Sequence, residues 1–107
     1  MNLSTHEKIE RDFHKQMIRV YRSAQIECNY TATRFVQMVS KDGGLCTAKK
    51  LLASPIISHG LTELHLCGRL DISMENLVLQ KPWRELFTDA ELALAEQRLI
   101  KLGFDVS

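Results

Sequence analysis

The stretch "STHEKIERDFHKQMIRVYRSAQIEC", residues 4 to 28, decides the fold class. Ser4 and Glu7 have capping-box spacing, which satisfies N–H groups that the first turn of a helix leaves unpaired. Apolar residues then recur at steps of three or four, which places them on one face of a helix. They are Ile9, Phe13, Met17, Val20, Ala24 and Cys28. A helix of this length measures about 36 Å, so we expect part of it to project beyond the rest of the domain.

The remaining chain also has helical spacing, interrupted by capping residues, glycine and proline. The second helix is expected at "TATRFVQMVS", with Asn29 or Thr31 as its cap and Asp42 to Gly44 at its end. Short helices should follow at "LCTAKKLLAS", which stops before Pro55, at "HGLTELHLCG", which Gly68 closes, and at "MENLVLQ", which Ser73 caps. One turn is expected at "PWRELF", and a last helix should run from the Thr88 to Glu91 capping box to Gly103. No stretch alternates as a strand would. We predict one all-α domain over residues 1–107 with about five to six helices: a long N-terminal helix, 1–28, and a compact helical core, 29–107.

Composition is that of a folded globular protein, with 45% hydrophobic and 25% charged residues. No segment approaches the roughly 20 apolar residues of a membrane helix, and the N-terminus is too polar for a secretory signal. We therefore expect a soluble, cytoplasmic protein. Cys28, Cys46 and Cys67 are odd in number and lie outside any Cys-x-x-Cys pair, which predicts three reduced, buried thiols.

No motif for chemistry stands out. His59, His65 and Cys67 are close in sequence, but positions i and i+2 of a helix point roughly 160° apart, which disfavours a zinc site. The sequence has no P-loop, dinucleotide fingerprint, HExxH helix or strand-turn-helix nucleophile elbow. We expect no catalytic residues, no cofactor and no metal, and hence a function in binding.

Charge is distributed unevenly. Residues 1 to 50 hold nine Lys/Arg and five Asp/Glu, a net +4, while residues 51 to 107 hold five and eight, a net −3. At 100° per residue, five cations of the first helix fall within a wedge of roughly 80° opposite the apolar stripe. This basic face consists of Lys8, Arg11, Lys15, Arg19 and Arg22. It is suited to phosphates or an acidic partner, and the alternative is a solvated helix surface.

The stretch "GRLDISMENL", residues 68 to 77, has the pattern of a joint between two helices. Gly68 ends one helix and Ser73 begins the next, so Arg69 and Asp71 lie in a tight turn. An arginine near a carbonyl end and an acid near an amide end suit both helix dipoles, and the two can pair with each other. We predict a structural role, with partner binding as the alternative.

From Tyr30 to Phe104 the chain resembles a family of small, mostly uncharacterised bacterial all-helical proteins. The segments carrying the likeness are "NYTATRFVQMVSKDGGLCTAKKLL", "HGLTEL", "GRLDISMENLVL" and "PWRELFTDAELALAEQRL". The resemblance implies an all-α bacterial domain, alone or beside nuclease-like and toxin-like modules, and it transfers no catalytic residue.

Two hypotheses follow for function. In the first, the protein is an immunity or antitoxin-type module that binds a toxin, such as a nuclease, through an acidic set in the second half of the chain. That set is Glu63, Asp71, Glu75, Glu85, Asp89 and Glu91. In the second, it is a nucleic-acid-binding accessory domain that uses the basic face.

Overall fold

The computed structural model describes residues 4–106, and all regular structure within them is helical. The α-helices are α1 (Thr5–Cys28), α2 (Thr33–Asp42), α3 (Gly44–Ala53), α4 (His59–Leu66), α5 (Met74–Val78) and α6 (Asp89–Lys101), with 3₁₀ turns η1 (Leu70–Ile72) and η2 (Trp83–Leu86). The prediction of a single all-α globule with a long N-terminal helix is confirmed. None of the helices in this range is both long and apolar enough to span a membrane.

Helix α1 follows the predicted pattern. The Ser4 hydroxyl accepts the N–H of Glu7 at 3.1 Å, and the stripe from Ile9 to Cys28 faces the interior, with Phe13 and Met17 fully buried. The expected cap at Asn29 was assigned to the wrong helix. Asn29 takes a left-handed conformation (φ 50°) and ends α1, as short polar residues at this position often do. Helix α2 begins two residues after Thr31, and its N-cap Ala32 makes no side-chain capping bond.

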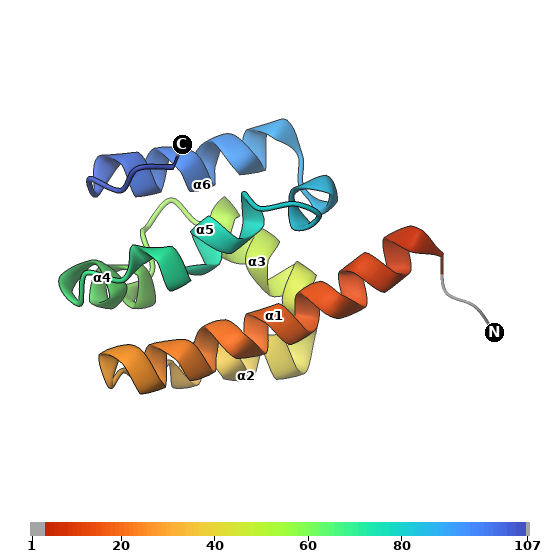
Figure 1. The fold of residues 1–107 in the computed structure, drawn as a ribbon. Helices are drawn as coiled ribbons and strands as arrows, with labels where there is room; N and C mark the ends of the chain where they lie inside the picture. Colours follow the sequence, from red (N-terminus) through yellow and green to blue (C-terminus); the bar gives the residue numbers. More distant parts are fainter. Residues whose placement is uncertain (1–3, 107) are drawn as a thin grey trace.

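The helices form three layers (Figure 1). Helices α1 and α2 lie on one side, α6 lies on the other, and α3, α4 and α5 fill the space between them. The molecule measures 44 × 27 × 23 Å, and the N-terminal turns of α1 extend past the other helices, as predicted. One hydrophobic cluster surrounds Phe13 and Met17, and a second surrounds Leu61, Leu64 and Leu99.

Helices α1 and α3 approach each other closely at Gly44. The Gly44 N–H donates to Nδ1 of His14 at 2.9 Å. His14 therefore acts as a side-chain cap for the first turn of α3, where a helix leaves N–H groups unpaired. A Cβ placed on Gly44 would lie 2.7 Å from the Cα of His14. Glycine is therefore required here by the contact between two backbones.

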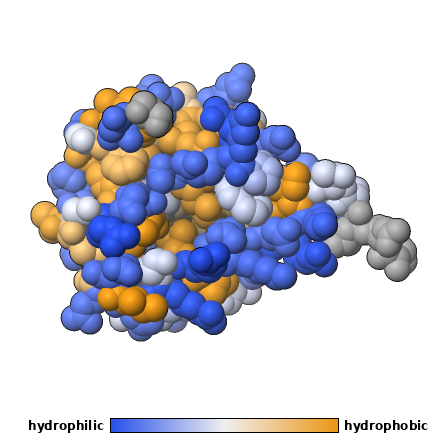
Figure 2. Space-filling view, in the orientation of Figure 1, coloured by the Kyte–Doolittle hydropathy of each residue, from blue (hydrophilic) through white to orange (hydrophobic). Residues whose placement is uncertain are grey.

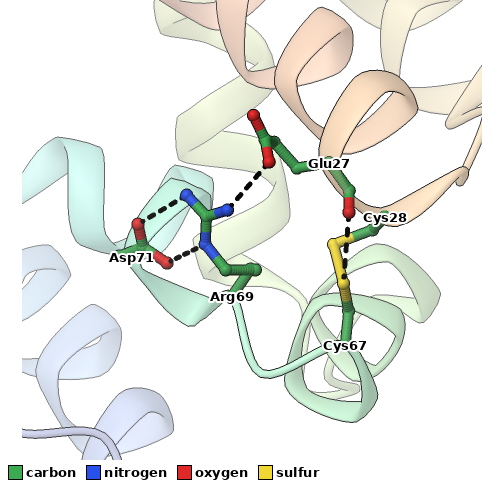
Figure 3. The surroundings of a disulfide bond; sticks show 5 residues. All are labelled: Glu27, Cys28, Cys67, Arg69 and Asp71. Atoms are coloured by element: carbon green, nitrogen blue, oxygen red, sulfur yellow. Dashed lines mark hydrogen bonds and ion pairs between the residues drawn. A yellow bond between two sulfur atoms is a disulfide. The ribbon is translucent and has the colours of Figure 1, made fainter.

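The predictions for the cysteines were wrong. Cys28, at the end of α1, forms a disulfide with Cys67 after α4, with their Cα atoms 5.8 Å apart (Figure 3). Cys46 is free, but it is exposed. An odd count and wide spacing gave no information about pairing, because the two bonded residues are 39 positions apart along the chain. Since disulfides are rare in reducing compartments, the thiol argument for a cytoplasmic protein fails.

The joint after α4 was predicted correctly. Gly68 takes a left-handed conformation (φ 75°), and the Ser73 hydroxyl accepts the N–H of Asn76 at 3.1 Å to begin α5. Helix α5 is shorter than expected, because it ends at Val78 and the chain turns before Pro82. The Thr88 to Glu91 capping box opens α6 with both of its hydrogen bonds present.

Candidate functional site

The basic face of α1 is present as the sequence predicts. All five of its cations are exposed, and none takes part in the ion pairs formed within residues 4–106. From Lys8 to Arg22 they span about 21 Å along the helix axis at 1.5 Å per residue. Figure 2 shows hydrophilic residues along most of the strip that α1 occupies in Figure 1. Since like charges one turn apart repel each other, helix stability alone does not account for this arrangement.

An apolar side chain continues the basic face toward its C-terminal end. Ile26 is 79% exposed and lies one turn beyond Arg22, within the same angular wedge. A branched aliphatic group in that position gains nothing from water or from a phosphate. An apolar contact beside arginines instead suits a protein interface, where Arg is enriched and the buried centre is more apolar than the rim.

The acidic set is drawn from α4, α5, α6 and the two 3₁₀ turns. Glu63 lies 3.4 Å from Nε2 of His59, and Glu91 both completes the α6 capping box and binds Nζ of Lys49 at 2.7 Å. Glu85 and Asp89 are exposed near the start of α6. These positions come from different elements, and several of the carboxylates already have a cationic partner. Part of the negative charge expected to attract a basic groove is therefore already paired within the fold.

Asp71 belongs to the joint. Arg69 donates to both oxygens of Asp71, at 3.0 and 3.1 Å, and its remaining branch donates to Glu27 of α1 at 3.1 Å (Figure 3). The hydrogen bonds from Arg69 lower the pKa of the Asp71 carboxyl. The Cys28 to Cys67 disulfide lies beside this bridge, so two links hold the end of α1 to the segment after α4. This arrangement supports the structural role that was predicted for Arg69 and Asp71.

Glu75 is removed from the partner-binding set, because it is 3% exposed. Its carboxyl lies 3.9 Å from Nη1 of Arg98 on α6, and its Oε2 has no hydrogen-bond partner. Burial raises the pKa of Glu75, although the charge of Arg98 acts in the opposite direction. The sequence suggested an exposed acid in the first turn of a helix. In the five-residue helix α5 this position faces Arg98 of α6 and is closed off from solvent.

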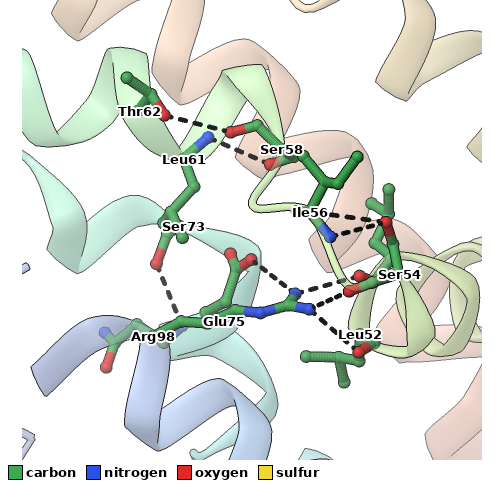
Figure 4. A network of polar contacts seen from close by, with 11 residues as sticks. Leu52, Ser54, Ile56, Ser58, Leu61, Thr62, Ser73, Glu75 and Arg98 are labelled. Atoms are coloured by element: carbon green, nitrogen blue, oxygen red, sulfur yellow. Dashed lines mark hydrogen bonds and ion pairs between the residues drawn. The ribbon is translucent and has the colours of Figure 1, made fainter. Parts of the chain in front are cut away.

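Arg98 is an important residue that the sequence did not single out. Its Nη1 donates to the carbonyl of Leu51 at 3.0 Å, and its Nη2 donates to the carbonyls of Leu52 and Ser54 (Figure 4). These carbonyls belong to the last turn of α3 and to Ser54 directly after it, where helices leave acceptors unsatisfied. Arg98 therefore caps α3 from a distant part of the chain. A cation near the end of a helical sequence gives no signal of this role, since it equally suits the dipole of its own helix.

The three residues considered for zinc do not form a site. Cys67 is in the disulfide, and His59 pairs with Glu63. Among residues 4–106 no three potential ligands from His, Cys, Asp and Glu lie close enough to hold a metal ion.

No protein-family model matches the chain, and neither a curated protein nor a solved structure matches it. The resemblance of residues 30–104 to small bacterial helical proteins stays a prediction.

Proposed function

We propose that the chain is a non-enzymatic module that binds an acidic protein through the basic face of α1 and Ile26. The observation that carries the proposal is five exposed cations on one wedge of a helix, none of them paired with a carboxylate of residues 4–106. A complementary acidic surface would be steered toward this face and would pair with cations that the fold itself leaves free. Ile26 adds an apolar contact that a nucleic acid backbone does not use.

A bacterial toxin domain is the partner class that we propose, and the protein would act as its immunity or antitoxin protein. The support for this class is the order of segments between Tyr30 and Phe104 described above. The contact surface differs from the one first expected. The basic face takes the place of the acidic set, so the toxin surface would be acidic where it meets α1.

Charge reversal tests the surface. A variant with Arg11, Lys15, Arg19 and Arg22 changed to Glu should lose affinity for the partner by 100-fold or more, on the order of 1 kcal/mol for each lost close pair. The matched control reverses four exposed cations elsewhere, Lys41, Lys81, Arg84 and Lys101, and changes the net charge equally. It should keep most of its affinity, because these positions lie outside the basic face.

The functional assay is growth of cells that co-express this chain and a toxin domain encoded beside it. Growth restored by the wild type and by the control variant, but not by the α1 variant, supports the proposal. The alternative accessory function predicts a different result: RNA or DNA binding by the wild type that weakens steeply with salt and is lost on reversal of the basic face. That result, without rescue of growth, would overturn the protein-binding proposal.

A further inference from the structure

A pocket of about 560 Å³ lies between α1, α2, α3 and α4. Its volume is within the range of small-molecule sites, which are typically concave and mostly apolar. Val20 and Ala24 of α1, Phe35 of α2, and Leu61 and Leu64 of α4 contribute apolar walls. Because Val20 and Ala24 belong to the apolar stripe of α1, the pocket lies on the side opposite the basic face. It is therefore separate from the surface proposed above for a protein partner.

Aromatic rings and an exposed isoleucine also line this pocket. Tyr21 and Tyr30 join Phe35 in its walls, and Ile56, on the segment between α3 and α4, is 76% exposed. Aromatic rings pack favourably against one another, edge to face or offset. A ring that filled the pocket would also remove part of the Ile56 side chain from water, which favours binding. The walls therefore suit a ligand with an aromatic body.

One cation that lines the pocket has no carboxylate partner in the described part of the chain. Arg34, in the first turn of α2, is exposed and forms no ion pair within residues 4–106. Lys50 also lines the pocket, but its Nζ lies 3.0 Å from the carboxylate of Asp42. Arg34 is therefore the side chain at which a negative charge on a ligand would meet a free cation.

The acid that lines the pocket does not oppose an anion beside Arg34. Glu75 is 3% exposed, and its Oε2 has less than 1 Å² of accessible surface. This oxygen lies 3.9 Å from Nη1 of Arg98, which offsets part of its charge. A ligand in the pocket does not reach this oxygen, so the ligand's selectivity depends on the accessible cation.

We propose that this pocket binds a small carboxylate that carries an aromatic ring, with the ring among the apolar walls and the carboxylate paired with the guanidinium of Arg34. Arginine suits this group, because its planar fork can donate two parallel hydrogen bonds to a carboxylate. Since Arg34 is exposed, the carboxylate stays in contact with water, and binding does not require full desolvation of its charge. Apolar burial then supplies affinity, and Arg34 supplies selectivity for the anion.

The test uses two matched probes, 4-phenylbutyrate and 4-phenylbutanamide, which share a ring and a chain and differ in the negative charge. Two-dimensional NMR of the full chain follows the amide shifts. We expect saturable shifts at residues of the pocket walls, such as Ala24, Leu61 and Leu64. The affinity for 4-phenylbutyrate should be at least about fivefold higher than for the amide, which is the contribution of one close guanidinium–carboxylate pair at a partly exposed site.

Two variants of α2 complete the design. Arg34→Gln removes the cation and should bring the affinities for the two probes within about twofold of each other, while the shifts stay at the same residues. Lys41→Gln removes another exposed cation of the same helix, outside the pocket, and should leave the preference unchanged.

Three results would each overturn the proposal. They are equal affinity of the wild type for the two probes, an unchanged preference in Arg34→Gln, and the absence of saturable shifts at the pocket walls, including shifts confined to the basic face of α1. None of these measurements requires the protein partner, so a failure here is distinguishable from a failure of the function proposed above.

Discussion

Replacement of Gly44 by alanine should destabilise the protein, although alanine normally stabilises helices. The added Cβ would lie 2.7 Å from the Cα of His14, about 1 Å short of the ~3.5 to 4.0 Å at which two carbon atoms attract each other. Because the obstacle is backbone, α1 and α3 must move apart. Overpacking of this kind costs about 1 to 3 kcal/mol. The movement also weakens the hydrogen bond from Gly44 to His14, which contributes about 1 kcal/mol.

Gly60 provides the matched control. It also lies in the first turn of a helix, but a Cβ there would meet Tyr30 at 3.8 Å and Ser58 at 3.9 Å, which are ordinary contacts. Gly60→Ala should therefore stabilise the protein by up to about 1 kcal/mol, by restricting the unfolded chain.

Urea unfolding followed by circular dichroism at 222 nm compares the variants. We expect a free energy of unfolding about 2 to 4 kcal/mol lower for Gly44→Ala than for the wild type. At about 4 °C per kcal/mol, this corresponds to a melting temperature lower by roughly 8 to 16 °C. If Gly44→Ala were as stable as Gly60→Ala, the close approach of α1 and α3 would be refuted.

Three further predictions concern the buried pair and the disulfide. Arg98→Met should lower the free energy of unfolding by about 3 to 5 kcal/mol in urea titrations, because it leaves Glu75 and the carbonyls of α3 unpaired, whereas Arg22→Met should change it by less than about 0.5 kcal/mol. Burial raises the pKa of Glu75, so the native state holds its proton more tightly than the unfolded state. The free energy of unfolding of the wild type should therefore fall, relative to Glu75→Gln, as the pH rises above about 4.5, and a difference independent of pH between 4 and 8 would contradict this. Reduction of the disulfide should lower the free energy of unfolding by about 2 to 4 kcal/mol, because the bond joins residues 39 positions apart. Adding a reductant should therefore lower the urea midpoint of the wild type and leave that of the Cys28→Ser, Cys67→Ser double variant unchanged.

The helices and most of their ends were predictable because their signals are local. The stripe of α1 repeats every three or four residues, so the side that packs was evident without any knowledge of its neighbours. The caps at Ser4, Ser73 and Thr88 depend on hydrogen bonds that span three residues, and the structure contains all three. The pairing of Arg69 with Asp71 was likewise predictable, since the two residues are only two positions apart in the chain.

The candidate sites were predictable only to the extent that they lie on one element. The basic face belongs to a single helix, and its exposure follows from lying opposite the stripe that packs. The acidic set was assembled from several helices, and no local pattern indicates how separate helices are oriented. The expectation therefore failed at Glu75, where a five-residue helix is too short to show which side faces the interior.

Only the tertiary structure decided which residues far apart in the chain contact each other. His14 meets Gly44, Glu75 meets Arg98, and Cys28 meets Cys67 across 39 residues. Each depends on the angle and depth at which helices pack, which are set by the volumes of all the side chains between them rather than by either partner. The sequence thus determined which surfaces of the helices are apolar or charged, whereas their packing determined the burial of the Glu75 carboxyl beside Arg98.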